Sequence, residues 1–177
     1  SQENETTAGT TSGYYAVDGW KYNNNGTYTP SASVAQVAGS SGSAYRLTLT
    51  STATPNASSH IDIRQPIEGV MMADLNWGTA SARPLTIGFD VTPNSTTSVA
   101  ATYTVTIMNA TEAVSVSGTF AISAGEKTAG IPVRKWVTFA GQTSGTWPTG
   151  AGVLGATIRF ALDQTASFCE TSGATFE

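Results

Sequence analysis

Composition and charge exclude several classes of protein at the outset. The chain of 177 residues has a net charge of −4 and only 11% charged residues, whereas about a quarter is typical of soluble domains. Its arginines are scattered singly rather than clustered, so we expect no nucleic-acid partner. No apolar run approaches the ~18 residues needed to span a membrane, so we expect no membrane insertion.

The N-terminal part of the chain is predicted to be an arm followed by the first strand. Residues 1–13 are polar and low in complexity, which is typical of a flexible arm or linker. Residues 14–177 suit one domain with a sizeable core, and we expect a single β-sandwich there. Within it, residues 14–22 are predicted to form a strand. Residues 23–26, Asn-Asn-Asn-Gly, are predicted to turn, because Asn and Gly tolerate positive φ.

Later segments alternate between apolar and polar residues with a period of two, as half-buried strands do. The clearest is residues 85–91, Leu-Thr-Ile-Gly-Phe-Asp-Val, in which every second residue is apolar. Residues 45–50, 103–107, 114–122 and 154–162 follow the same pattern. Because one face of each strand must be buried, these segments predict one shared core made of Leu85, Ile87, Phe89, Val105, Ile107, Phe120, Ile122, Ile158 and Phe160.

Only residues 68–75 are predicted to be helical, over about two turns. The apolar residues Val70, Met71 and Leu75 are expected to cover one open end of the fold. Residues 124–127, Ala-Gly-Glu-Lys, are predicted to form a turn. Many short strands with frequent turns predict an all-β fold, an antiparallel two-sheet β-sandwich that is jelly-roll-like and has one short helix.

Several motifs follow one another in a characteristic order. They are Asp18-Gly19-Trp20, Gln65-Pro66-Ile67-Glu68-Gly69, Asp74-Leu75, Trp77-Gly78-Thr79-Ala80, and residues 84–91, 136–147 and 158–162. In order and spacing they resemble carbohydrate-binding-like β-sandwich modules of bacteriophage and prophage tail fibres, head spikes and related virion proteins. The family pattern continues after Gly-x-x-Phe-Glu into a last strand, whereas this sequence stops at Phe176-Glu177. We therefore expect that the last strand is truncated.

The resemblance implies a function, partners and a location. It implies a non-enzymatic virion module, from a tail fibre, head spike or capsid decoration, that binds host-surface carbohydrate. Its partners would be a host-cell glycan and other virion proteins, in a symmetric homo-oligomer for which a trimer is the first expectation. The module would be assembled in the cytoplasm of a bacterial host and end in the extracellular particle. Two alternatives stay open: a purely structural capsid or tail subunit without a sugar site, and an accessory domain of a polysaccharide-degrading enzyme.

The residues themselves argue against catalysis. His60, the only histidine, adjoins an Ile-Asp-Ile strand, where a loop histidine is a more natural interpretation than a general base. The sequence has no Gly-x-Ser-x-Gly elbow, phosphate-binding loop or zinc-ligand spacing. A glycosidase needs two carboxylates that face one cleft, but Glu68 and Asp74 are expected to point to different sides of the predicted helix. We expect that the protein is not an enzyme.

Two tryptophans are the candidates for a sugar site, because sugar C–H faces stack on aromatic rings. Trp147 lies in a loop rich in glycine and is expected to be an exposed platform. Trp136 alternates with apolar Val137 and is expected to face away from the core. If the loop folds back over the strand that precedes it, Gln142 and Arg134 would contact sugar hydroxyls beside the two rings. The alternative is that both tryptophans serve packing alone.

No cofactor is expected. A structural calcium ion is conceivable, because hard cations prefer carboxylate oxygens and Asp18, Asp74, Asp163 and Glu177 lie near predicted strand ends. The acidic residues do not cluster with the spacing of a metal-binding loop, so no metal ligand is assigned.

Overall fold

The computed structural model describes residues 13–14, 20–25, 31–39, 42–50, 60–91, 101–129 and 131–161. The predicted arm, residues 1–13, lies outside these ranges except for Gly13, and so does the C-terminal end after residue 161. The elements are β1 (Gly13–Tyr14), β2 (Lys21–Asn25), β3 (Ser31–Gly39), β4 (Gly42–Thr50), β5 (His60–Glu68), α1 (Gly69–Met72), the 3₁₀ helix η1 (Ala73–Leu75), β6 (Leu85–Val91), β7 (Ala101–Asn109), β8 (Ser115–Ile122), α2 (Ala124–Ala129), β9 (Val133–Phe139) and β10 (Leu154–Ala161).

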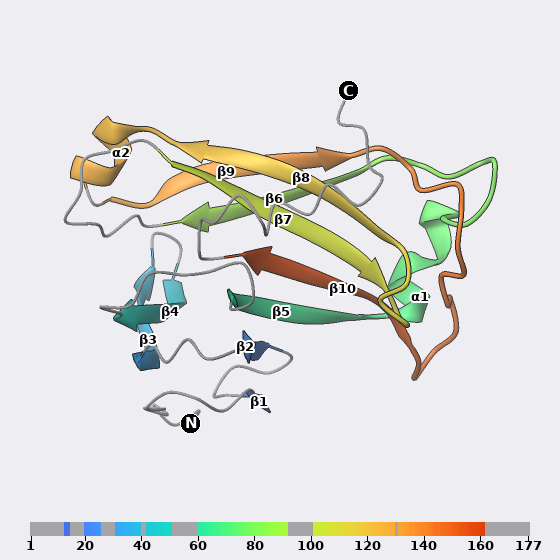
Figure 1. Cartoon of the computed structure of the whole chain (residues 1–177), viewed down its shortest axis with the longest axis horizontal. Coiled ribbons are helices and arrows are strands. Elements are labelled where there is room, and N and C mark those ends of the chain that lie inside the picture. Colours follow the sequence, from blue (N-terminus) through green and yellow to red (C-terminus); the bar gives the residue numbers. More distant parts are fainter. Residues whose placement is uncertain are drawn as a thin grey trace.

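Two antiparallel sheets pack face to face. One sheet has the strand order β1-β2-β5-β10-β7-β8, and the other consists of β6 and β9. A separate hairpin joins β3 to β4. The chain passes from one sheet to the other at β5–β6, β6–β7, β8–β9 and β9–β10, as strands of a jelly roll do. The predicted all-β, antiparallel two-sheet sandwich is therefore confirmed (Figure 1).

The core lies between these two sheets. Val105, Ile107 and Ala156 of the larger sheet are fully buried against Val137 and Phe139 of β9. A Cβ on Gly118 of β8 would overlap with Val137, so the glycine is what lets the sheets approach there. The predicted core set is confirmed: apart from Ile122, which is buried but is not part of this cluster, its members belong to the cluster or pack against it.

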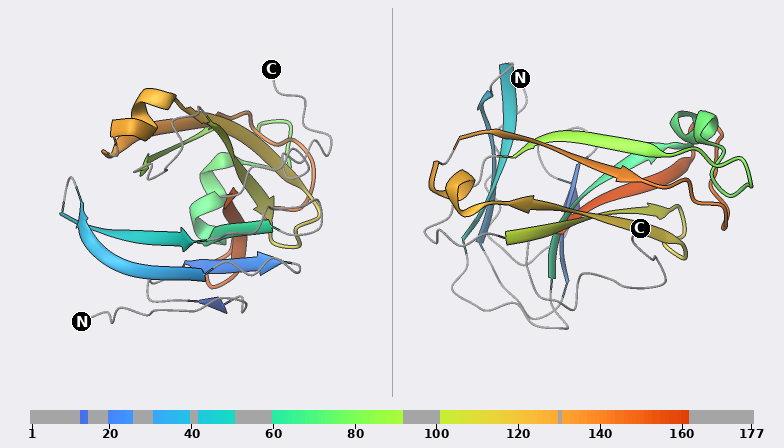
Figure 2. Two further views of the ribbon diagram at one scale, coloured as in Figure 1. Left: turned by 60° about the vertical axis from the view of Figure 1, so that its left-hand side comes forward. Right: turned by 90° about the horizontal axis from the view of Figure 1, so that it is seen from above.

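The helices lie at opposite ends of the sandwich (Figure 1). The predicted helix is present as α1 and η1, but it buries Gly69 and Met72, whereas Val70 and Met71 are exposed. Leu75 packs against the core as expected. The views in Figure 2 place the β3–β4 hairpin at the same end as α2, away from α1.

Two predicted turns are strand or helix in the structure. Asn23, Asn24 and Asn25 were expected to turn, but they belong to β2 and pair with β5, where Asn23 faces Asp62. Pairing along a neighbouring strand thus overrides the turn preference of asparagine. Residues 124–127 begin α2, a second short helix that the sequence analysis did not predict.

Candidate functional site

Trp147, expected to be an exposed platform, is buried at 6% exposure. Its ring packs edge-on against Trp77, with the centroids 4.8 Å apart, and its Nε1 donates to the Ser144 carbonyl at 2.9 Å. Gly145 has φ +82°, a conformation that lets the loop turn just before the tryptophan. The loop therefore inserts Trp147 into the core, and the expectation of an exposed ring was wrong.

Gln142 lies in the loop that contains Trp147, at the corner of the fold where this loop meets the loop after η1. Its backbone carbonyl accepts from the Gly78 amide at 2.7 Å, which joins the Trp147 loop to the loop after η1. Its side-chain Oε1 accepts from the Ser144 hydroxyl at 3.2 Å. Both contacts are internal to the corner, so Gln142 supports Trp147 rather than lying beside Trp136 in the way the sequence analysis expected.

A buried asparagine joins a third loop to this corner. Asn109, at 3% exposure, ends β7, and its Oδ1 accepts from the amides of Ala113 and Val114 at 3.0 and 3.1 Å. Its Nδ2 donates to the Thr146 carbonyl at 3.1 Å. We use "the corner loops" for residues 76–83, 109–114 and 141–153. They are fixed to one another by backbone and side-chain hydrogen bonds.

Trp136 faces outward from β9, as expected, and is 61% exposed. It lies opposite Gly88 of β6, and a Cβ on that glycine would overlap with the indole. The ring therefore lies across the strand in the space that the missing side chain leaves. This arrangement, in which an aromatic residue covers a glycine on the adjacent strand, stabilises sheets.

Arg134 lies beside Trp136 on the same face. Its guanidinium carbon is 4.7 Å from the ring centroid, and its Nη1 is 3.2 Å from Asp90 Oδ1 across the sheet. Thr86 and Thr138 share a hydrogen bond of 2.9 Å further along the strands. We call this surface the Trp136 face; it comprises Thr86, Gly88, Asp90, Arg134, Trp136 and Thr138. Of the four predicted site residues, the structure thus brings Trp136 and Arg134 together and places Trp147 and Gln142 in the corner.

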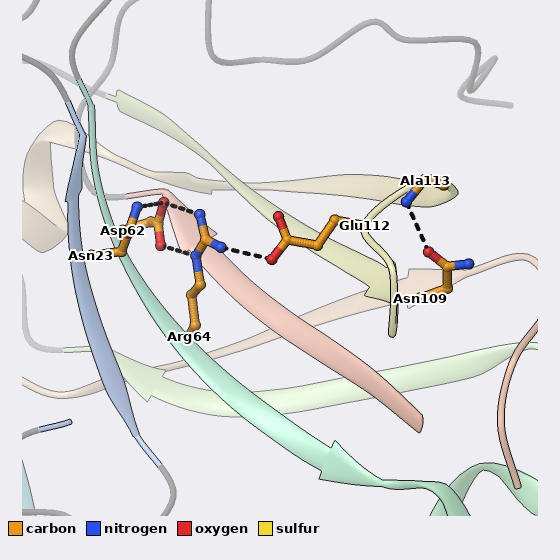
Figure 3. A network of polar contacts seen from close by, with 6 residues as sticks. All are labelled: Asn23, Asp62, Arg64, Asn109, Glu112 and Ala113. Carbon is orange, nitrogen blue, oxygen red and sulfur yellow. Dashed lines mark hydrogen bonds and ion pairs between the residues drawn. The ribbon is translucent and has the colours of Figure 1, made fainter. Parts of the chain in front are cut away.

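The outer face of the larger sheet holds a polar network that was not predicted from the sequence (Figure 3). Asp62 of β5 is fully buried, and its Oδ1 accepts from Arg64 Nε at 2.6 Å. Asn23 donates to Asp62 Oδ2 at 3.2 Å, and Arg64 Nη1 reaches Glu112 Oε1 at 3.0 Å. Asp62 and Arg64 are two residues apart and are separated by Ile63. This spacing indicates that both charged side chains lie on one face of β5, with the isoleucines on the other.

The ionisation of Arg64 reflects this network. Burial alone would lower the pKa of Arg64, but its hydrogen bond to Asp62 and the charges of Asp62 and Glu112 raise the pKa above its ordinary value. The guanidinium is thus charged at any pH at which the protein is folded. The network ties β2, β5 and the β7–β8 turn together as a fixed ionic cluster.

Among the residues that the structure describes, no group of three His, Cys, Asp or Glu side chains could hold a metal ion. Asp18, Asp163 and Glu177, three of the four carboxylates considered for calcium, lie outside those residues. No helix in the described part of the chain is both long and apolar enough to cross a membrane.

Comparisons with protein-family models, curated proteins and solved structures find no match to this chain. The resemblance to phage modules, and the function that it implies, stay predictions from the sequence.

Proposed function

We propose that this chain is a non-enzymatic phage virion module that binds host-surface carbohydrate through the Trp136 face. The observation that supports the binding site most is the exposure of Trp136, at 61%, on an otherwise regular strand surface. An exposed indole offers a flat apolar surface on which a ligand can stack. The virion context, whether in a tail fibre, a head spike or a capsid decoration, rests on the sequence motifs alone.

The chemistry of the Trp136 face suits a sugar ring. An indole offers a flat apolar surface for C–H groups, while Arg134 can donate hydrogen bonds to hydroxyls and Asp90 can accept them. Arg134 lies over the ring in the free protein, so a stacking sugar has to displace it. An exposed cation–π contact contributes only about 0.5–1 kcal/mol, which is a small barrier to displacement.

Replacement of one ring tests the proposal. Loss of a stacked ring should cost about 1–3 kcal/mol, so Trp136→Ala should weaken binding to whole host cells or to an arrayed glycan roughly tenfold to a hundredfold. Gly88→Ala keeps the indole but displaces it from the strand, so it should also weaken binding. Ile131→Ala is the matched control, because Ile131 is equally exposed, at 60%, but lies outside the face.

Thermal melts of the same three variants separate binding from folding. Trp136→Ala and Ile131→Ala should melt close to the wild type, since the replaced side chains are exposed. Gly88→Ala, which displaces the indole from the strand, should melt somewhat lower. If the wild-type protein binds neither polysaccharide nor host cells, the carbohydrate proposal is wrong. If binding survives Trp136→Ala undiminished, the site lies elsewhere.

A second candidate, a structural capsid or tail subunit without a sugar site, is favoured by a different surface. Val70 and Met71 of α1 are 52% and 68% exposed, and Val153 and Leu154, at the start of β10, are 45% and 40% exposed. The Gly69 amide donates to the Val153 carbonyl at 2.8 Å, which holds the two segments together. Clustered exposed apolar side chains are typical of contacts between proteins, here with other virion proteins or further copies of this chain.

A further inference from the structure

Arg159 of β10 is a buried cation on the outer face of the larger sheet. The residues directly before and after it, Ile158 and Phe160, pack against the core. Because successive side chains of a strand point to opposite faces, Arg159 points away from the core. It is only 7% exposed, and its Nε has no hydrogen-bond partner among the residues that the structure describes. Buried polar groups are almost always paired, so this donor calls for a partner.

The neighbouring carboxylates are already engaged. Arg64, the cross-strand partner of Arg159 on β5, uses Nε and Nη2 on the two oxygens of Asp62, at 2.6 and 3.2 Å. Its Nη1 contacts Glu112 at 3.0 Å (Figure 3). Both carboxylates are thus held by Arg64, and neither forms an ion pair with Arg159. Arg159 forms no ion pair among the described residues.

The neighbours of Arg159 on β7 and along β10 that carry polar side chains offer hydroxyls, not acids. Thr106 lies opposite on β7 and shares a hydrogen bond of 2.9 Å with Ser117 of β8. Thr157, two residues earlier on β10, is buried on the same face. Hydroxyls can contact an anion, but they do not compensate a positive charge.

Charge and burial together indicate which kind of ligand would bind beside the Arg159 side chain. A buried ion is unstable without a counter-charge, and an arginine cannot escape by losing its proton. Two arginines directly opposite each other on neighbouring strands also repel. A water molecule could satisfy Nε but would place no negative charge against Arg159, whereas an anion would do both.

We propose that Arg159 binds an oxyanion, the carboxylate, sulfate or phosphate group of a ligand, on the outer face of the larger sheet between Arg64 and Thr106. The planar guanidinium favours two parallel hydrogen bonds to such a group. This site is separate from the Trp136 face, which lies on the opposite side of the sandwich, so it does not depend on the proposed carbohydrate function.

Thermal melts test the site. Sodium sulfate should raise the melting temperature of the wild type above that in sodium chloride of equal ionic strength, and the rise should saturate. Sulfate also stabilises proteins by exclusion from their surface, so the decisive comparison is with Arg159→Met. In that variant the melting temperature should still rise through exclusion but should lose the rise that saturates with sulfate concentration. The reason is that loss of a charge-assisted hydrogen bond weakens the affinity for sulfate roughly tenfold or more. Arg134→Met, which removes an arginine from the Trp136 face, should respond as the wild type does.

Two further ligands distinguish the source of the anion. Sodium glucuronate, and glucose with an equal concentration of sodium chloride, match in ionic strength and differ in the sugar only at C6, where one carries a carboxylate and the other a hydroxymethyl group. A response to glucuronate but not to glucose therefore indicates an acidic sugar. A response to sulfate as well indicates a site for any small oxyanion. Equal responses of the wild type and Arg159→Met to every anion would overturn the proposal.

A spectroscopic measurement keeps the proposal testable if Arg159→Met does not fold. The Nε–Hε proton of an arginine gives its own nitrogen–proton correlation signal, and Arg159→Lys removes this signal while keeping the charge. In the wild type, titration with sodium sulfate should shift the one Nε–Hε signal that is missing in Arg159→Lys. If no Nε–Hε signal moves, or if the moving signal persists in Arg159→Lys, Arg159 does not bind the anion.

Discussion

Two tryptophans of this chain occupy opposite environments, and each environment follows from its neighbours. Trp147 fills the corner against Trp77, and both indole nitrogens donate to backbone carbonyls at 2.9 and 2.7 Å. Trp136 instead lies on the surface over Gly88. A buried ring with a satisfied donor contributes mainly to stability, whereas an exposed ring is available to a ligand.

Trp147→Ala is therefore expected to destabilise the fold strongly. Removal of a buried aromatic ring costs about 3–5 kcal/mol because it leaves a cavity, while Trp136→Ala should change the free energy of unfolding by only about 0.5 kcal/mol. Denaturation in urea, followed by circular dichroism, measures both. A Trp147→Ala variant as stable as the wild type would contradict the packing described for the corner loops.

Glu126 is expected to make the stability of the fold depend on pH. Its hydrogen bond with Lys135, at 2.7 Å, and that with the Ser123 amide lower the pKa of Glu126 from its ordinary value of 4.5. A lowered pKa in the folded state contributes stability above pH 4.5, and this contribution is lost as the pH falls through the folded-state pKa. Glu126→Gln should therefore melt below the wild type at pH 7.

The difference between the two proteins should narrow as the pH falls below 4.5 and disappear once Glu126 is protonated in the folded wild type. Lys135→Met serves as a control, because it removes the largest cause of the lowered pKa and should reduce the same pH dependence. Melting temperatures measured from pH 7 down to acid would reveal this convergence. A difference in melting temperature between the wild type and Glu126→Gln that stays constant at every pH would show that the ionisation of Glu126 does not contribute to stability.

At the scale of elements, α2 owes its start to a local motif. The Ser123 hydroxyl accepts from the Glu126 amide at 3.2 Å, and Glu126 Oε2 accepts from the Ser123 amide at 2.8 Å. This reciprocal pair is a capping box, a recognised signal for the beginning of a helix. It explains why residues 124–127 form a helix rather than the turn that their Ala-Gly-Glu-Lys sequence suggested.

The packing of α1 against β10 depends on two glycines. Gly155 interrupts the regular pairing of β10 with β5, and a Cβ there would lie 2.6 Å from the Gly69 Cα. Because the obstacle is backbone, it cannot move aside as a flexible side chain can. The helix can therefore approach the strand this closely only while both positions lack a side chain.

Gly155→Ala and Gly125→Ala are expected to have opposite effects. The first should lower the free energy of unfolding by about 1–3 kcal/mol, as overpacking does. The second lies in α2 with nothing within 4 Å of an added Cβ, and it should raise stability by up to about 1 kcal/mol through the helix propensity of alanine. Chemical denaturation of both variants measures the signs, and a Gly155→Ala variant at least as stable as the wild type would contradict the close contact of α1 with β10.

The parts of the fold that the sequence predicted are those governed by local alternation. Leu85, Ile87 and Phe89 pack on the core because a period of two determines their side of the sheet. The position of Trp147 was not predictable in the same way, since it depends on Trp77, which is 70 residues away in the sequence. The ionic cluster was missed for a similar reason, because Glu112 reaches Arg64 across an intervening strand.

At the scale of the whole molecule, the exposed apolar patch predicts association. Val70, Met71, Val153 and Leu154 lie at one end of the sandwich, and low surface charge does little to oppose contact between copies. We expect the protein to sediment as an oligomer, with Met71→Glu shifting it toward the monomer of 18.2 kDa. Thr138→Glu adds the same charge on the Trp136 face and should leave the assembly unchanged.

Sedimentation equilibrium at micromolar concentration distinguishes these outcomes. A wild type that sediments as a clean monomer would contradict the association, and it would also weaken the structural-subunit candidate. If Thr138→Glu disrupts the oligomer and Met71→Glu does not, the Trp136 face is the contact between copies, and a glycan cannot occupy it in the assembly.

We expect the side chain of Asn109 to slow the exchange of amide hydrogens in one turn with deuterated solvent. Amides at the tip of a hairpin normally exchange fast, but the amide of Ala113 donates to Asn109 Oδ1 (Figure 3), and so does that of Val114. The same side chain donates to Thr146. Slow deuteration of this turn would thus report the opening of the corner loops, even though neither amide belongs to the loop that contains Trp147.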